Sequence, residues 1–329
     1  MKKLILILML GVIFSGFIQA EKVTQSTEIA KKSEPKLLWT KEFDGEIKSF
    51  AASYDGKYIA VGVDKSKLNK DKSEYIYTKT DVVLLNKLGK EIGKKEIDIK
   101  LGLIKLGNKR AFIVASNYRK LKVFDFKEKI IWETVSPGIP MISPEDNYIA
   151  TIDDGTGGDS SAGLKVYDVN GNLLWKYNPE KFCGATFLGD DKIVFISFDD
   201  YGSSIYKDGV MQKIEKTRGA LKIFTTSSGE VIYETIFEIP FPIYLIVNID
   251  IDTKKNIIDL LCRATDTYKN IIINLPSNLV ATGNIQKESL SSNKLYPSSN
   301  KGAVYRDTFE SDSFILKKLN NKEIGFYTK

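Results

Sequence analysis

The sequence predicts an all-β fold built from repeated four-stranded units, and three observations predict it. One strand motif occurs three times, as Leu-Lys-Val-Phe at 121–124, Leu-Lys-Val-Tyr at 164–167 and Leu-Lys-Ile-Phe at 221–224. A turn and a second apolar strand follow each copy, and that strand carries Trp132, Trp175 or Tyr233. No stretch has the sustained apolar period of a helix, because the apolar runs are short, β-branched and separated by turn residues.

A second repeated element lies upstream and gives the length of the unit. Tyr-Ile-Ala at 58–60 follows Asp55-Gly56 and recurs at 148–150 after Glu145-Asp146, an offset of 90 residues (148 − 58), or two units of about 45. In the clearest unit, Asn170-Gly171 is a tight-hairpin signal between the last two strands. The expected quartets of strands span about 47–97, 98–135, 138–177, 182–238, 243–285 and 290–328.

These units predict that residues 37–329 form a single domain, a β-propeller of six or seven four-stranded blades. The segment Leu37–Phe43 is left over as an isolated strand of the fourth-strand type. A strand from one terminus can complete the blade formed by the other terminus and so hide two sheet edges. We therefore expect the ring to close near Trp39, with the Ser- and Asn-rich segment 286–300 leaving the count open between six and seven.

Residues 1–20 are predicted to be a secretory signal peptide. Lys2 and Lys3 precede an apolar run that is shorter than the roughly 20 residues of a membrane-spanning helix, and the small residue Ala20 marks the cleavage site. Residues 21–36 are then an N-terminal linker. The alternative is an uncleaved N-terminal anchor. No cysteine follows the cleavage site as a lipid attachment point, so we expect a secreted or periplasmic protein without a membrane span after cleavage.

Composition excludes several kinds of chemistry and partner. The chain has no histidine, which excludes His-based triads, His general bases and His-ligated metal sites. Its lysines are scattered, so a nucleic-acid partner is not expected. Cys183 and Cys262 lie in apolar runs, which favours two separately buried thiols, and a disulfide is the alternative that an oxidising compartment would permit. Phosphate-loop, dinucleotide and nucleophile-elbow motifs are absent.

The unit from Lys165 to Trp175 (Lys-Val-Tyr-Asp-Val-Asn-Gly-Asn-Leu-Leu-Trp) resembles the repeat of quinoprotein-type (PQQ-type) β-propellers. That repeat consists of a strand, an Asp, a turn Gly, aliphatic residues and a Trp. The segment Phe126-Lys127-Glu128 departs from it by lacking the turn Gly, and Val280 replaces Trp in the fifth unit. The resemblance implies a fold and an exported location. It implies no cofactor, because the cofactor-contacting residues of quinone-binding members have no match here. We expect the Trp residues to pack between blades.

Three connections between second and third strands are long, at about 64–80, 153–163 and 199–219, and we expect them to share one rim of the ring. Loops on a rigid scaffold are where binding concentrates, and aromatic rings beside charges suit recognition. Four lysines lie in the first connection, Lys65, Lys67, Lys70 and Lys72. The candidate binding residues are Tyr75, Tyr77, Asp153, Asp154, Asp159, Asp199, Asp200, Tyr201 and Tyr206.

The leading functional hypothesis is a non-enzymatic exported scaffold that binds a protein, peptide or other ligand in the cell envelope or outside the cell, with no cofactor. The alternative is a carboxylate-dependent hydrolase or lyase acting on extracellular saccharides, with Asp153, Asp154, Asp199 and Asp200 as candidates by position alone. A divergent quinoprotein that binds a cofactor is a third hypothesis. The Asp- and Gly-rich connection at 153–161 would suit Ca²⁺ but does not fit the calcium-loop spacing, so no metal is predicted. The oligomeric state stays open.

Overall fold

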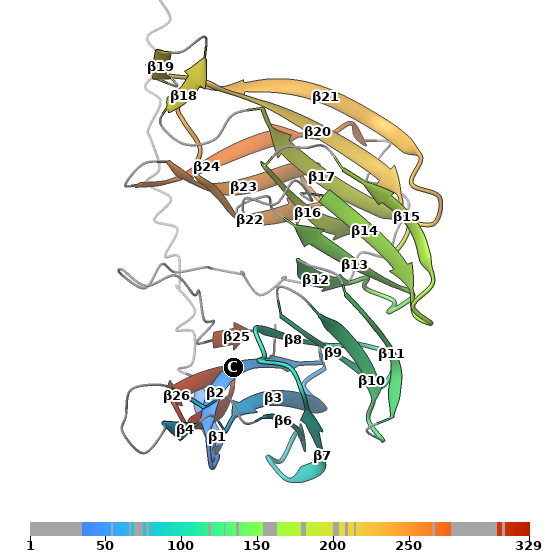
Figure 1. Ribbon diagram of the computed structural model, residues 1–329, viewed down its shortest axis with the longest axis vertical. Coiled ribbons are helices and arrows are strands. Elements are labelled where there is room, and N and C mark those ends of the chain that lie inside the picture. Colours follow the sequence, from blue (N-terminus) through green and yellow to red (C-terminus); the bar gives the residue numbers. More distant parts are fainter. Residues whose placement is uncertain are drawn as a thin grey trace, which may run out of the picture. The chain divides into compact units, whose positions relative to one another are not determined.

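The elements of the computed structural model are antiparallel β-strands, β1 to β27, which confirms the all-β prediction for the part of the chain described (Figure 1). All described residues belong to one compact unit, Pro35–Lys329. Among them, no helix is long and apolar enough to cross a membrane. The structure describes residues 35–53, 55–65, 67–68, 75–76, 79–117, 120–127, 129–135, 138–153, 163–178, 182–199, 204–207, 210–213, 215–264, 267–277, 308–310 and 313–329.

Six larger sheets follow one another along the chain, and we number them in that order. Sheet 1 contains β2 (Glu46–Ala52), β3 (Tyr58–Asp64), β6 (Thr80–Asn86) and β7 (Glu91–Ile97). Sheet 2 contains β8 (Leu103–Leu106), β9 (Phe112–Ser116), β10 (Leu121–Asp125) and β11 (Ile130–Thr134). Sheet 3 contains β12 (Ile139–Ile142), β13 (Tyr148–Asp153), β14 (Gly163–Asp168) and β15 (Leu173–Tyr177).

The remaining sheets differ more in their strands. Sheet 4 contains β16 (Phe182–Leu188), β17 (Lys192–Phe198), β20 (Thr217–Thr225) and β21 (Val231–Ile239). Sheet 5 contains β22 (Leu245–Asp252), β23 (Ile257–Ala264) and β24 (Thr267–Asn274). Sheet 6 contains β25 (Thr308–Glu310), β26 (Phe314–Asn320), β27 (Glu323–Thr328) and β1 (Lys36–Glu42). Two small hairpins pair β4 (Lys67–Leu68) with β5 (Tyr75–Ile76), and β18 (Ser204–Lys207) with β19 (Val210–Lys213).

The strand at the N-terminal end of the described chain completes the last sheet, as predicted. β1 pairs antiparallel with β27, from Lys36 opposite Thr328 to Glu42 opposite Glu323. The expected quartets of the first four units are confirmed as sheets 1 to 4. In the fifth unit the strand expected near Val280 lies outside the described residues, and so does the segment 286–300.

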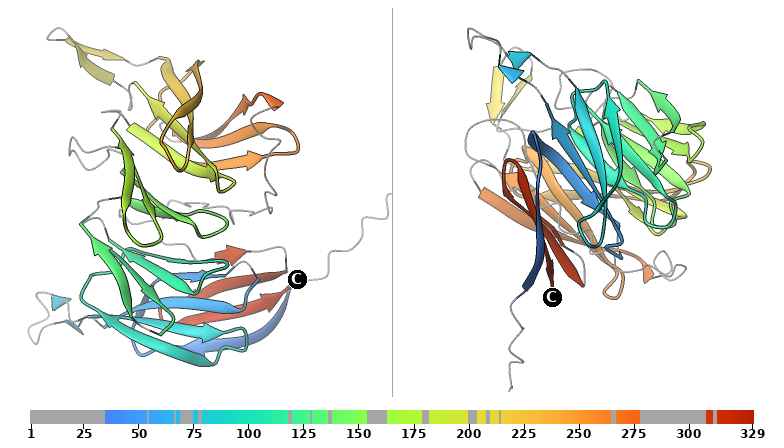
Figure 2. Two further views of the ribbon diagram at one scale, coloured as in Figure 1. Left: turned by 90° about the vertical axis from the view of Figure 1, so that its right-hand side faces the viewer. Right: turned by 90° about the horizontal axis from the view of Figure 1, so that it is seen from below.

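Neighbouring strands form separate small sheets (Figure 2), and buried side chains join sheet 6 to sheet 1 and sheets 1 to 5 in order. Sheet 6 packs on sheet 1 through a cluster that includes Phe314 and Phe50, and four further clusters join sheets 1 to 5 in order. The second strands of sheets 1 to 4 are therefore largely buried on both faces, and Phe112–Ser116 has no exposed position. Continuous apolar runs such as this one are what a strand covered on both sides requires, whereas fourth strands such as Leu173–Tyr177 are mostly exposed.

Three tryptophans lock a fourth strand to the neighbouring sheet, which confirms their predicted packing role. The indole N–H groups of Trp39, Trp132 and Trp175 donate to the carbonyl oxygens of Lys87, Val169 and Thr226 at 2.7–2.9 Å. Each acceptor lies in a turn whose glycine contacts the same Trp ring; these are Gly89, Gly171 and Gly229, with φ of 74°, 89° and 72°. A Cβ at Gly171 would lie 2.5 Å from Trp132. Glycine is thus required both by the left-handed backbone and by the close approach.

The interface between sheets 1 and 2 lacks both partners of this lock. Gly93 of β7 stands where β1, β11 and β15 carry Trp, and the turn of sheet 2 contains Phe126 and no glycine. There the ring of Tyr58 meets the ring of Phe126 edge to face, with centroids 4.7 Å apart. The Trp and the turn glycine are thus both absent from this interface.

Candidate functional site

The candidate site is the end of the sheets that carries the long connections between second and third strands. We call this end the insertion end and the opposite end, with the turns between first and second and between third and fourth strands, the turn end. The connections β3 to β6, β13 to β14 and β17 to β20 are long, as predicted, at 65–79, 154–162 and 199–216. The equivalent connections in sheets 2, 5 and 6 span only 117–120, 265–266 and 321–322.

The predicted binding residues are only partly described. Tyr75 lies in β5 and Tyr206 in β18, where it pairs with Met211 across the hairpin. Asp153 ends β13, and its carbonyl oxygen accepts a hydrogen bond from the Cys183 thiol at 3.2 Å. The side chains of Tyr75 and Tyr206, and all of Tyr77, Asp154, Asp159, Asp200 and Tyr201, lie outside the described residues.

A charged network forms the base of the first insertion. Asp81 is the second residue of β6, in a run that is buried in sheet 1, and its side chain is only 3% exposed. The ammonium groups of Lys65 and Lys94 approach its Oδ2 at 2.7 and 2.8 Å. Burial would raise the pKa of Asp81, but the two lysines outweigh burial and hold that pKa below its ordinary value.

This network also joins the insertion to the connection between sheets 6 and 1. Lys65 lies 3.6 Å from the carboxylate of Asp44, which follows β1. Lys65, one of the four lysines noted in the first connection, is therefore held by two carboxylates. Its first role is to neutralise Asp81.

The third insertion stands on an extension of sheet 4. β20 and β21 are nine residues long and pair from Phe224 opposite Val231 to Thr217 opposite Ile239. The hydroxyl of Thr217 donates to the carbonyl of Phe241 at 3.0 Å, which anchors the extension to the chain leading to sheet 5. Beside it, Arg218 Nε lies 4.0 Å from the carboxylate of Asp199.

The two cysteines are buried and form no disulfide with each other, as the sequence favoured. Cys183 packs between sheets 3 and 4, and Cys262 packs between sheets 4 and 5. Burial raises the pKa of Cys262 to about 12, so its thiol stays protonated and unreactive.

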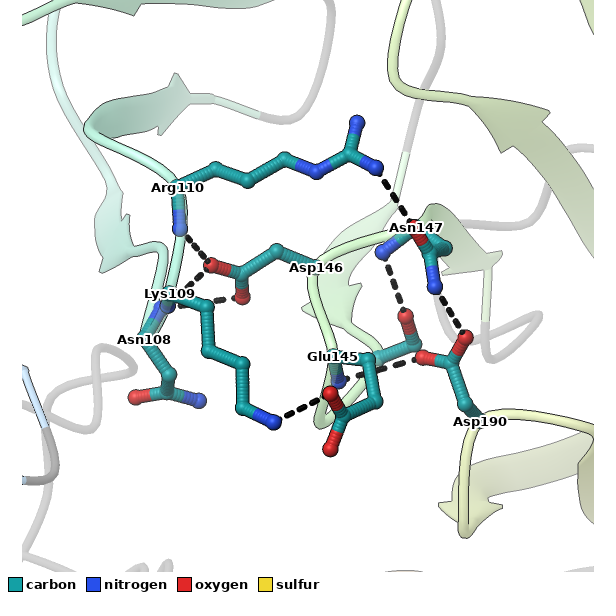
Figure 3. Close-up of polar contacts among 8 residues, drawn as sticks. Asn108, Lys109, Arg110, Glu145, Asp146, Asn147 and Asp190 are labelled. Atoms are coloured by element: carbon teal, nitrogen blue, oxygen red, sulfur yellow. Dashed lines mark hydrogen bonds and ion pairs between the residues drawn. The ribbon is translucent and has the colours of Figure 1, made fainter.

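A polar network that the sequence did not predict joins sheets 2, 3 and 4 at the turn end (Figure 3). Asp146, in the turn between β12 and β13, is fully buried. Its carboxylate accepts the backbone N–H groups of Asn108, Lys109 and Arg110, in the corresponding turn of sheet 2, at 2.5–2.9 Å. Burial raises the pKa of Asp146, and the three amides offset this effect only in part.

Asp190 repeats this arrangement one sheet further along. Its carboxylate accepts the backbone N–H of Glu145 at 3.1 Å and the side-chain amide of Asn147 at 2.8 Å. Asn147 in turn accepts from the guanidinium of Arg110 at 2.6 Å, and Lys109 pairs with Glu145. Sheets 2, 3 and 4 are thus tied in series through their turns.

A signal for Asp146 was present in the sequence. Two turns between first and second strands correspond to each other: one runs from Ser53 to Tyr58 and the other from Ser143 to Tyr148. Asp146 and Gly56 occupy the same place in these turns, with φ of 61° and 67°. In both turns the hydroxyl oxygen of the leading Ser accepts the N–H of the closing Tyr, at 3.1 Å for Ser53 and 3.0 Å for Ser143. A non-glycine residue at a position of positive φ indicates that the interactions of its side chain offset the backbone strain.

In the ranges that the structure covers, no three acidic or cysteine side chains gather into a group that could hold a metal ion. The buried carboxylates Asp81 and Asp146 are committed to lysines and to backbone amides. No protein-family model matches this chain, and a search of curated proteins finds no match.

Proposed function

We propose that the chain is an exported β-propeller of six or seven blades, six being the simplest count, that binds a protein or peptide partner through its insertion end. Pairing of β1 with β27 supports ring closure at this strand. The serial packing of six sheets and the Trp-to-turn locks support wedge-like blades of the quinoprotein type. The apolar segment 4–17 after Lys2 and Lys3 supports export.

The observation that carries the binding role is the pair of extra hairpins. β4-β5 and β18-β19 each form a separate two-stranded sheet, and the four-stranded sheets 1 and 4 are complete without them. A two-stranded hairpin is only marginally stable by itself, so these segments contribute little to folding. Chain length that the fold does not need, held on a rigid scaffold, is typical of a recognition surface.

Contacts at the insertion end support a rim shared by several blades. Chain that enters or leaves a sheet touches the insertion end of that same sheet at three places. Asp44 pairs with Lys65, the N–H of Gly102 donates to Ser116, and the carbonyl of Phe241 accepts from Thr217. In sheets 1, 2 and 4 the connecting chain therefore lies at the insertion end of the sheet. The insertions of sheets 1 and 4 leave from that same end.

Site-specific photo-cross-linking tests the proposal. A photoreactive amino acid is placed at Tyr75, at Tyr206 or, as the control at the turn end, at exposed Lys57, and intact cells are irradiated. We expect one and the same protein adduct from positions 75 and 206 and none from position 57. Adducts of equal yield from all three positions, or none from 75 and 206, would contradict a binding role for this end.

A further inference from the structure

The lysines of the repeated strand motif have different partners in the three sheets that carry them. In sheet 2, Lys122 of β10 lies directly opposite Glu133 of β11, with 2.9 Å between ammonium and carboxylate. In sheet 4, Lys222 of β20 lies opposite Glu234 of β21, at 3.0 Å. In both sheets the third strand supplies the cation and the fourth strand supplies the anion.

Both of these lysines are strongly held. The side chain of Lys122 is only 9% exposed and makes a second ion pair with Asp98 at 2.6 Å. Lys222 also lies over the ring of Tyr177, 5.4 Å from its centroid. Ion pairing of this kind is what a largely covered ammonium group requires.

Sheet 3 breaks the pattern, because its third and fourth strands place two lysines opposite each other. Lys165 of β14 pairs in register with Lys176 of β15. The neighbour of Lys165 on the other side, in β13, is Thr151, which carries no charge. Among the described residues, neither lysine has a carboxylate within the 4.0 Å of an ion pair. Like charges directly opposite destabilise an antiparallel pair.

We infer that Lys165 and Lys176 form a binding site for an oxyanion that comes from outside the chain, a carboxylate, sulfate or phosphate group. Lys165 is the third residue of β14, which begins at Gly163 directly after the second long connection, so the site lies near the insertion end. An anion between the two ammonium groups replaces the glutamate that sheets 2 and 4 carry at this place. The inference concerns the chain's own charges and does not depend on the proposed partner.

Sulfate alone is the probe. Thermal unfolding is followed for the wild-type protein with increasing sulfate, against chloride at the same ionic strength. Bound sulfate should raise the wild-type Tm by about 3 °C more than in the Lys176→Glu variant at ten times the dissociation constant. Sulfate also stabilises proteins generally through exclusion from their surface, and that part should be equal in all variants.

Three variants make the test specific. Lys176→Glu restores the Lys–Glu pair of sheets 2 and 4, so it should raise Tm by roughly 1 °C without sulfate and abolish the sulfate-specific increment. Lys129→Glu, the same charge change at an exposed turn position of sheet 2, should keep that increment. The third variant, Asp154→Asn with Asp159→Asn, removes two carboxylates from the second connection. It should respond to sulfate as the wild type does.

Two results would overturn the inference. An equal sulfate increment in the wild type, Lys176→Glu and Lys129→Glu would show general exclusion and no site. An increment that appears only in the Asp154→Asn, Asp159→Asn variant would show that the chain's own connection neutralises the lysines, so that no external anion is taken.

Discussion

Asp81 at the insertion end and Asp146 at the turn end are both buried carboxylates, but their partners are of different kinds. Asp81 is flanked by two ammonium groups, which hold its pKa below the ordinary value. Asp146 is surrounded by backbone N–H groups of the preceding sheet, and burial raises its pKa. The first carboxylate balances charge within one sheet and its insertion, whereas the second holds two sheets together.

This difference separates the two ends of the scaffold. Hydrogen bonds from backbone to carboxylate and from indole to carbonyl tie the turn end across sheet boundaries. At the insertion end, the network around Asp81 consists of ion pairs with partly exposed lysines, which are individually weaker. We therefore expect the hydrogen bonds of the turn end to contribute more to stability than the ion pairs around Asp81.

Removal of the Asp146 carboxylate should have the largest effect. Asp146→Ala leaves three backbone N–H groups without their acceptor and keeps a side chain at positive φ, so the free energy of unfolding should fall by about 3 kcal/mol. Asp146→Gly, which copies Gly56, should be less harmful by about 1 kcal/mol because glycine accepts this backbone conformation. Urea unfolding measures both, and a loss below about 1 kcal/mol in both variants would refute the inter-sheet role.

Neutralisation of Asp81 should cost less. Asp81→Asn leaves Lys65 and Lys94 without their shared anion, but both lysines are partly exposed, so we expect a loss of about 1–2 kcal/mol at neutral pH. Asp44→Asn, which removes an exposed carboxylate from the same network, is the matched control and should change stability by less than about 0.5 kcal/mol. Equal losses in the two variants would show that burial of Asp81 has no special weight.

Loss of the contact between one Trp and its turn should lower the free energy of unfolding by less than Asp81→Asn does. Trp132→Phe keeps most of the ring contact with Gly171 but removes the hydrogen bond to Val169, which is worth about 1 kcal/mol. Gly171→Ala should be more damaging than Trp132→Phe, and the two effects should not add because both act on the same contact. Simple additivity in a double-mutant cycle would contradict the lock.

The pH dependence of stability should distinguish the two carboxylates by sign. The pKa of Asp81 is lower in the folded state, so its contribution is present above the ordinary carboxyl pKa of about 4 and is lost as pH falls through the folded value. The pKa of Asp146 is higher in the folded state, so its contribution decreases as pH rises from about 4 through the folded value. Wild-type stability minus that of Asp81→Asn should therefore rise with pH, and wild-type stability minus that of Asp146→Asn should fall. Slopes of the same sign would contradict the opposite pKa shifts of Asp81 and Asp146.

Much of the fold could be predicted from the sequence because its signals are local. A strand pair is defined within a few residues by the alternation of apolar and polar side chains, by a turn such as Asn170-Gly171 and by the Trp that follows. Sheets 1 to 4 lie where the sequence predicted strands from signals of this kind. The pairing of the isolated strand at Trp39 with the last sheet could also be predicted, because an unpaired strand needs a partner sheet. The hairpins β4-β5 and β18-β19 were missed because their strands are only 2 and 4 residues long, too short for a period to be recognised in the sequence.

Contacts that depend on distant geometry could not be predicted. The partners of Asp146 lie 36 to 38 residues earlier in the chain, in a turn that no local pattern links to it. The pairing of Lys165 with Lys176 depends on the register of β15, which shifts at an irregularity between Val166 and Tyr167. A shift of one residue reverses the face of every side chain, so the charge pattern became visible only with the pairing in place.

The central claim, that the sheets hold the fold and the insertions are free for binding, can be tested by shortening one insertion. Ser204 pairs with Lys213, so an Asn-Gly turn in place of residues 205–212 can close the hairpin and remove Tyr206. Urea unfolding of this variant should keep the wild-type midpoint and slope, with a change in free energy below about 0.5 kcal/mol. A clearly lower midpoint, or a second transition, would show that the insertion is part of the folded core and contradict the account.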